Sequence, residues 1–83
     1  MNIYVGNLAY RLTENELEEL FREYGEVTSV KIIMDKFTGK SKGYGFVEMA
    51  NEGEGETAIE ELDGAEVGGR NIKVNKARPP KKY

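Results

Sequence analysis

The stretch TGKSKGYGFVEM, residues 38–49, combines three glycines and two lysines with two aromatic residues, Tyr44 and Phe46. Its GKS triplet resembles the end of a phosphate-binding loop. That loop has the pattern G-x-x-x-x-G-K-[ST], however, and the position five residues before Gly39 is Met34. The triplet also leads into a strand pattern, not into a helix whose N-terminus would hold phosphate. The sequence therefore does not predict a nucleotide site here.

Residues 43–50 have the alternating pattern of a half-buried β-strand. Because successive side chains of a strand point to opposite faces, one face is small and aliphatic and the other is aromatic and acidic. Gly43 and Gly45 are expected to keep the strand slim and to allow close backbone approach. The inward residues are expected to be Gly45, Val47 and Met49, and the outward ones Tyr44, Phe46 and Glu48.

Residues 12–25 carry a strong helix pattern. Thr13, followed three positions later by Glu16, forms a capping box, and Gly25 is expected to end the helix. Apolar residues recur at helical spacing and predict one buried stripe. This stripe consists of Leu17, Leu20, Phe21 and Tyr24.

Residues 51–64 predict a second, weaker helix. Gly53 and Gly55 each cost about 1 kcal/mol relative to alanine in a helix interior. Asn51 and Glu54 are suited to cap its N-terminus. Its inner stripe is expected to be Ala58, Ile59 and Leu62.

Three further strands are predicted over residues 2–6, 27–34 and 71–77, and a turn over residues 67–70. The resulting order is β-α-β-β-α-β. This order predicts an α+β ferredoxin-like sandwich, in which a four-stranded antiparallel sheet carries two helices on one face.

The other face of this sheet is expected to remain open and to carry aromatic rings among polar residues. Three exposed rings are unusual in a small domain without a binding role. Nucleic-acid bases stack on aromatic rings, and lysines bind phosphates. The pattern thus predicts a surface for single-stranded nucleic acid. Its residues are Tyr4, Tyr44 and Phe46, with Lys31, Lys73 and Asn75 beside them.

Two segments, IYVGNL (residues 3–8) and KGYGFVEM (residues 42–49), resemble the two motifs of the RNA recognition motif family, in the right order and on the right strands. The second motif has the pattern K/R-G-F/Y-G/A-F-V-x-F/Y. The chain matches it except at the last position, where Met49 replaces an aromatic residue. Since Met49 is expected to face the helices, this departure should matter little for binding. The chain is most similar to short single-domain members from bacteria.

The resemblance implies roles for individual residues. Tyr4 and Tyr44 are expected to stack on successive bases, Phe46 to lie against the sugars between them, and Lys42 to reach a phosphate. Lys76 should face the opposite side. The remaining RNA contacts that the resemblance implies, on and just after the last strand, are Lys73, Asn75, Ala77 and Arg78.

Composition limits the other possibilities. The 83 residues suffice for one small domain, predicted over residues 1–77, followed by a short basic tail at 78–83. Without Cys or His the chain offers no disulfide, zinc site, thiol nucleophile or imidazole base, and no cofactor or metal is expected. No apolar run is long enough to span a membrane, so a cytoplasmic location is expected. The missing His and Cys, together with the lack of a convergent carboxylate pair, predict a non-catalytic protein. A monomer is expected. A post-transcriptional or RNA-chaperone role follows from the resemblance alone, as does preference for RNA over weakly bound single-stranded DNA.

The net charge of −3 hides a segregation of charge along the chain. Acidic residues concentrate in the two predicted helices, whereas ten of the twelve Lys and Arg residues lie between Lys31 and Lys82, outside the acidic blocks. An alternative function is therefore a protein-interaction module that binds a basic partner through its acidic helical face. The position of Phe37, either under the sheet edge or on the binding surface, is left open.

Overall fold

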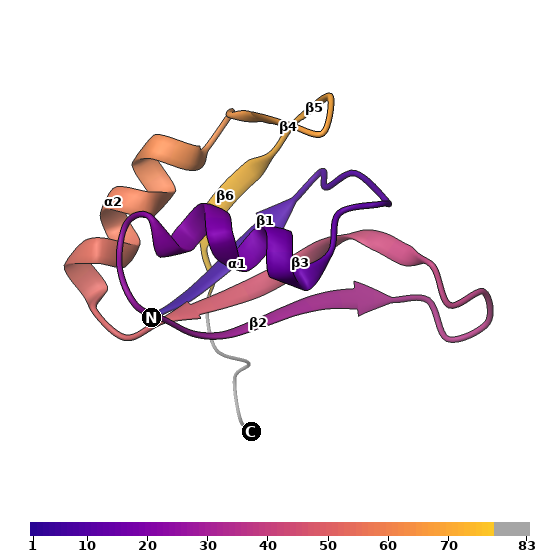
Figure 1. Cartoon of the computed structure of the whole chain (residues 1–83), viewed down its shortest axis with the longest axis horizontal. Coiled ribbons are helices and arrows are strands. Elements are labelled where there is room, and N and C mark those ends of the chain that lie inside the picture. The colour runs from indigo at the N-terminus through magenta and orange to yellow at the C-terminus, as the bar shows by residue number, and fades with distance from the viewer. Residues whose placement is uncertain (78–83) are drawn as a thin grey trace, which may run out of the picture.

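The computed structural model describes residues 1–77, and these form a four-stranded antiparallel sheet with two helices (Figure 1). The strands lie in the order β2 (Val27–Met34), β3 (Ser41–Met49), β1 (Asn2–Gly6) and β6 (Lys73–Lys76). All three neighbouring pairs are antiparallel. The predicted β-α-β-β-α-β fold is confirmed.

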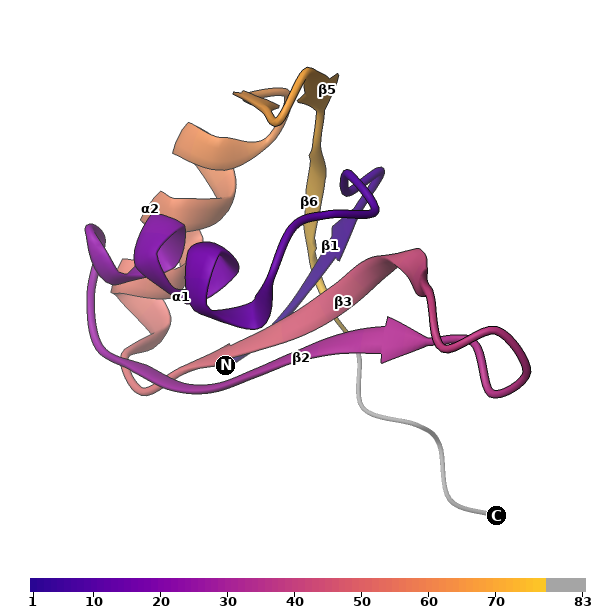
Figure 2. The ribbon, with the colours of Figure 1, turned by 45° about the vertical axis from the view of Figure 1, so that its right-hand side comes forward.

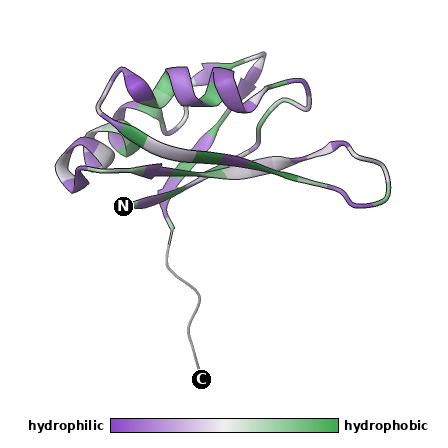
Figure 3. Ribbon diagram, turned by 60° about the horizontal axis from the view of Figure 1, so that its bottom comes forward, coloured by the Kyte–Doolittle hydropathy of each residue, from purple (hydrophilic) through white to green (hydrophobic). Residues whose placement is uncertain are grey.

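Both helices, α1 (Glu14–Arg22) and α2 (Glu52–Leu62), pack on the same side of the sheet (Figure 3). Their apolar stripes and the inward residues of the strands form one core, as alternation along the strands and helical spacing predict. The buried core residues are Ile3, Val5, Leu8, Leu17, Phe21, Ile32, Val47, Met49, Ala58, Leu62, Ile72 and Val74.

The helix N-termini are capped as the sequence predicts. Thr13 Oγ1 accepts a hydrogen bond from the Glu16 amide at 3.2 Å, and Glu16 Oε1 accepts one from the Thr13 amide at 3.0 Å. In α2, Asn51 Oδ1 accepts a hydrogen bond from the Glu54 amide at 2.9 Å. The prediction that Gly25 ends α1 is wrong, because the helix already ends at Arg22 and the chain turns there.

Gly43 and Gly45 have different roles in β3. Ile32 pairs with Gly45 and Met34 with Ser41, so β3 contains a bulge between these two pairs. Gly43 lies in this bulge with a φ of 84°, a conformation that disfavours any side chain. The expected close approach occurs at Gly45, where a Cβ atom would collide with the Lys31 carbonyl oxygen.

The predicted fourth strand is shorter than expected and is preceded by a small hairpin. The segment before β6 contains β4 (Glu66–Val67) paired with β5 (Arg70–Asn71), which lie beyond the end of α2 (Figure 2). The turn between them contains Gly68 and Gly69, both with positive φ. This agrees with the turn predicted over residues 67–70.

Both outer strands of the sheet receive a carboxylate from the helical layer. Glu14 Oε2 accepts a hydrogen bond from the Ile32 amide of β2 at 2.9 Å. On the opposite edge, Asp63 Oδ1 accepts one from the Val74 amide of β6 at 3.0 Å. These bonds occupy edge amides that could otherwise pair with another strand.

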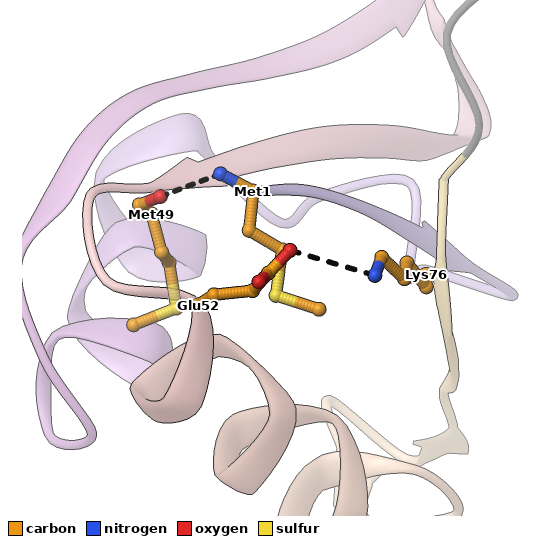
Figure 4. A network of polar contacts seen from close by, with 4 residues as sticks. All are labelled: Met1, Met49, Glu52 and Lys76. Carbon is orange, nitrogen blue, oxygen red and sulfur yellow. Dashed lines mark hydrogen bonds and ion pairs between the residues drawn. The ribbon is translucent and has the colours of Figure 1, made fainter.

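Met1 extends the pairing of β1 with β3 at one end of the sheet (Figure 4). Its amino group donates to the Met49 carbonyl oxygen at 2.8 Å, and the Met49 amide donates to the Met1 carbonyl oxygen at 2.9 Å. Nearby, Lys76 Nζ lies 3.6 Å from Glu52 Oε1. Lys76 therefore points to the helical side, as the alternation predicts.

Candidate nucleic-acid interface

A single row of outward side chains crosses all four strands of the sheet. Lys31 on β2 is opposite Phe46 on β3, Phe46 is opposite Tyr4 on β1, and Tyr4 is opposite Asn75 on β6. The register thus places a lysine at one end of the row, an amide at the other and two rings between them. Lys73 follows on the same face of β6, opposite Gly6.

Tyr4, Tyr44 and Phe46 form one ring cluster on the open face of the sheet. The ring centroids are 6.0 Å apart for Tyr4 and Tyr44, 5.9 Å for Tyr4 and Phe46, and 6.3 Å for Tyr44 and Phe46. Such separations are typical of interacting aromatic pairs. Phe46 is 39% exposed and the two tyrosines are half-buried by their neighbours, so none of the three rings belongs to the core.

Charged groups surround the ring cluster unevenly. Lys31, Lys42 and Lys73 are all exposed on or beside this face. One carboxylate, Glu48, also lies on it, where Glu48 Oε1 accepts a hydrogen bond from Thr28 Oγ1 at 3.0 Å. Since the acidic helices pack on the opposite face, the charge segregation seen in the sequence becomes a separation between two sides of the sheet.

The remaining predicted site residues are placed less centrally. Ala77 is half-buried, and its amide donates to the Asn2 carbonyl oxygen at 2.9 Å, which continues the pairing of β6 with β1. Arg78 and the rest of the predicted basic tail, 78–83, lie outside the described residues. Asn7, in the loop after β1, adopts a φ of 56°, and its side-chain amide donates to the Asn71 carbonyl oxygen at 2.8 Å, so it has a structural role.

Two residues near the ring cluster were not among the predicted site residues. Tyr10, in the loop after β1, is 67% exposed, and the Arg70 guanidinium carbon lies 5.6 Å from the centroid of its ring. This distance is that of a cation–π contact. Because Tyr10 lies in a loop, strand alternation does not assign its side chain to either face of the sheet. The pairing with Arg70 joins residues far apart in the chain, so no local pattern indicates it.

The loop between β2 and β3 ends the site on one side. Phe37 at its tip is 98% exposed, so it does not lie under the sheet edge, and its ring makes no contact with the three rings of the cluster either. Asp35 Oδ1 accepts hydrogen bonds from the amides of Phe37 at 2.8 Å and Thr38 at 3.1 Å. These two backbone bonds, first that of Phe37, lower the pKa of Asp35 below its ordinary 3.8, and nearby Lys42 adds to this effect. Asp35 is therefore ionised at neutral pH.

Residues 1–77 offer little for metal chemistry or membrane insertion. They contain no group of three His, Cys, Asp or Glu side chains placed to hold a metal ion. Among these same residues, no helix is long and apolar enough to cross a bilayer.

An open sheet face that carries a ring cluster between lysines is the kind of surface on which domains that bind flat aromatic ligands stack them. Comparison with known proteins gives the family, because the family model described as RNA recognition motif matches residues 3–73. The chain belongs to the RNA recognition motif family, a non-catalytic family, which confirms both the predicted resemblance and the prediction that it is not an enzyme.

Individual relatives support this membership. RbpB of Nostoc sp., named as a candidate RNA-binding protein, is 54% identical over 79 residues, covering 95% of this chain and 77% of its own. The crystal structure of RNA Binding Protein PG1 matches with a TM-score of 0.93 and 49% identity over 99% of both chains. A Sex-lethal protein–RNA complex matches with a TM-score of 0.91 and 37% identity, over 98% of this chain and 48% of that one.

Proposed function

We propose that this protein binds single-stranded RNA, without catalysis, on the open face of its sheet. The observation that carries the proposal is the ring cluster of Tyr4, Tyr44 and Phe46, which is held together on the face opposite the helices. A base stacked on such a ring gains about 1–3 kcal/mol, whatever its identity. Family membership and the RNA-bound Sex-lethal relative favour RNA as the ligand.

The charged and polar residues around the rings suit the nucleic-acid backbone. Lys31, Lys42 and Lys73 would contact phosphates, and the Asn75 amide would donate to or accept from a base edge or sugar. Ala77 and Arg78 would extend the contact beyond β6. One face of this size should engage about two to four nucleotides with loose sequence preference and marked dependence on salt.

The wider biological setting belongs to the same proposal. Residues 1–77 would act as one binding domain, and the basic segment 78–83 would add phosphate contacts. A domain of this kind suits a cytoplasmic post-transcriptional factor or RNA chaperone, with single-stranded DNA bound more weakly. A monomer is favoured because carboxylates of Glu14 and Asp63 occupy amides on both sheet edges.

The test is a fluorescence-anisotropy titration with random-pool single-stranded RNA at low and moderate salt. The variant Tyr4→Ala, Tyr44→Ala, Phe46→Ala removes the ring cluster, and Phe37→Ala is the control because it removes a still more exposed ring away from the cluster. We expect the triple variant to bind at least ~10-fold more weakly, since the loss of each stack costs about 1–3 kcal/mol. Circular dichroism establishes that each variant is folded.

Two outcomes would overturn the proposal. Wild-type protein that fails to bind RNA at low salt would exclude this function. Equal binding by the wild type and the folded triple variant would place the RNA site elsewhere.

A second candidate function is binding of a basic peptide on the helical side. A hollow there has an apolar base and an acidic rim, lined by Leu12, Leu20 and Val67 together with Glu16, Glu19 and Glu23. Binding of a lysine-rich amphipathic peptide, weakened by Leu20→Ser but not by loss of the ring cluster, would support it. Peptide binding that is indifferent to Leu20→Ser would exclude this hollow.

A further inference from the structure

Tyr10 stands at the end of the sheet where the ring cluster stops. It belongs to the loop that follows β1, and its ring is 67% exposed. Arg70, from β5, holds its guanidinium 5.6 Å from the centre of the ring. The contact joins two segments that the fold brings together, so the ring is positioned by more than its own loop. An exposed ring with a cation beside it is suited to stack on a base.

An open hollow of about 710 Å³ connects Tyr10 to the ring cluster. Tyr10 and Tyr44 both line it, and the rest of its wall comes from the loop between β2 and β3 and from the start of β3. Arg70 does not line this hollow, although it lines two others that also include Tyr10. Arg70 can therefore support the ring without filling the space next to Tyr44. The remaining lining residues are Asp35, Thr38, Lys40, Ser41 and Lys42.

We propose that this hollow is an additional base-binding subsite, in which a nucleotide next to the one on Tyr44 stacks against Tyr10. The inference rests on the proposed RNA-binding function and extends its footprint beyond the sheet. A single-stranded RNA chain that leaves the ring cluster past Tyr44 meets Tyr10 next, because both rings line the same hollow.

The polar lining of the hollow fits a nucleotide. Lys40 and Lys42 stand on its wall and provide two ammonium groups for the phosphate that links this nucleotide to its neighbour. Asp35, whose carboxylate accepts hydrogen bonds from the amides of Phe37 and Thr38, also lines the hollow and is an acceptor suited to a base N–H. The hollow thus combines a stacking ring, cations and an acceptor.

The experiment measures how RNA affinity grows with oligonucleotide length. Fluorescein-labelled random-pool RNAs of about three to about seven nucleotides are titrated by anisotropy at constant salt. For the wild type we expect affinity to rise about 5- to 150-fold once the RNA is long enough to reach Tyr10. Tyr10→Ala should lose this rise but keep the wild-type affinity for the shortest RNAs that bind.

Two control variants isolate the ring of Tyr10. Tyr10→Phe keeps an aromatic ring and should keep the gain with length. Phe37→Ala removes a more exposed ring that does not line the hollow and should also keep it. Because Tyr10 lies largely in solvent, its substitution is not expected to unfold the domain, and a urea unfolding curve of each variant verifies this.

The possible failures are distinguishable. If the wild type binds short RNAs and gains nothing with length, or if Tyr10→Ala gains as much as the wild type, the subsite is excluded while the proposed function stands. A Tyr10→Phe variant that loses the gain as Tyr10→Ala does would exclude stacking as its basis. If the wild type binds no RNA of any length, the proposed function itself fails.

Discussion

At the scale of single residues, Gly45 determines how closely β2 approaches β3. Its backbone passes so near Lys31 that an added methyl group would collide with the Lys31 carbonyl oxygen and crowd Ile32. Phe46, the next residue, is opposite Lys31 in the same strand pair and belongs to the ring cluster. A glycine inside a strand often marks such a close approach of two backbones.

We therefore expect Gly45→Ala to destabilise the protein by about 1–3 kcal/mol, the usual cost of forcing extra atoms into a packed site. The measurement is urea unfolding followed by circular dichroism, with the midpoint compared with that of the wild type. RNA affinity of the remaining folded protein should also fall, because β3 must shift away from β2. An unchanged midpoint would contradict this account of Gly45.

Asp35 gives a second prediction at this scale. Its carboxylate accepts hydrogen bonds from the amides of Phe37 and Thr38, and these bonds lower its pKa below 3.8. A lowered folded-state pKa means that the contribution of Asp35 to stability is present above its unfolded-state pKa. That contribution is lost as pH falls through the lower, folded-state value. The hydrogen bonds that hold the β2–β3 loop to the Asp35 carboxylate should therefore persist at mildly acidic pH.

An NMR titration tests the Asp35 prediction directly. The Phe37 and Thr38 amide resonances should shift together, with a common midpoint below 3.8. In Asp35→Asn, which keeps an acceptor but has no ionisable group, this common titration should disappear. A midpoint at or above 3.8 in the wild type would show that the two hydrogen bonds do not stabilise the charged form.

At the scale of elements, the two helices differ in how strongly their own residues favour the helical conformation. The capping box of α1 places reciprocal hydrogen bonds between Thr13 and Glu16. α2 has only the Asn51 cap and contains two glycines, one of which, Gly55, is buried beside the Met1 side chain. Gly55 weakens α2 as an isolated helix, but it also allows this helix to pack closely on the end of β1.

Loss of the α1 cap should be measurable. Thr13→Ala removes the side-chain acceptor for the Glu16 amide, and we expect a loss of about 1 kcal/mol in the free energy of unfolding. Thr13→Ser retains the hydroxyl group and should remain close to the wild type. Urea unfolding of the three proteins gives the comparison. Equal stability of Thr13→Ala and Thr13→Ser would mean that the hydroxyl does not cap the helix.

At the scale of the whole molecule, the two sides of the sheet carry different charges. The acidic helices lie on one side, and Lys31, Lys42 and Lys73 lie on or beside the open face. Two cations on the helical side are paired locally, Arg22 with Glu18 at 3.7 Å and Lys76 with Glu52 at 3.6 Å. A protein with a net charge of −3 can therefore still present a basic surface to RNA.

The salt dependence of binding tests this separation. Lys31→Gln with Lys73→Gln should weaken RNA binding and reduce the slope of log K against log salt by about 0.7 for each phosphate that the variant no longer neutralises. The control variant, Arg22→Gln with Lys76→Gln, removes the same charge from the helical side and should bind nearly as the wild type does. Equal weakening in both variants would mean that net charge, not its position, controls binding.

Much of the fold and of the site could be predicted from local sequence patterns. Alternation along 43–50 assigned Tyr44 and Phe46 to the open face, and the Thr13 and Glu16 spacing predicted the start of α1. These features depend on side-chain periodicity and on interactions within a few residues. The role of Gly43 and the end of α1 were predicted less well, because a bulge and a helix end depend on how neighbouring elements pair.

Tertiary structure alone decided which distant residues meet. Sequence determined the order of the two helices and of the four strands of the main sheet, and it assigned the side chains of Tyr4, Tyr44 and Phe46 to the open face, because strand alternation is a property of the backbone. It did not determine that Arg70 would lie over the ring of Tyr10, or that Tyr10 and Tyr44 would line one hollow. These arrangements follow from strand order, the β3 bulge and the path of the loops, which depend on packing of the whole domain.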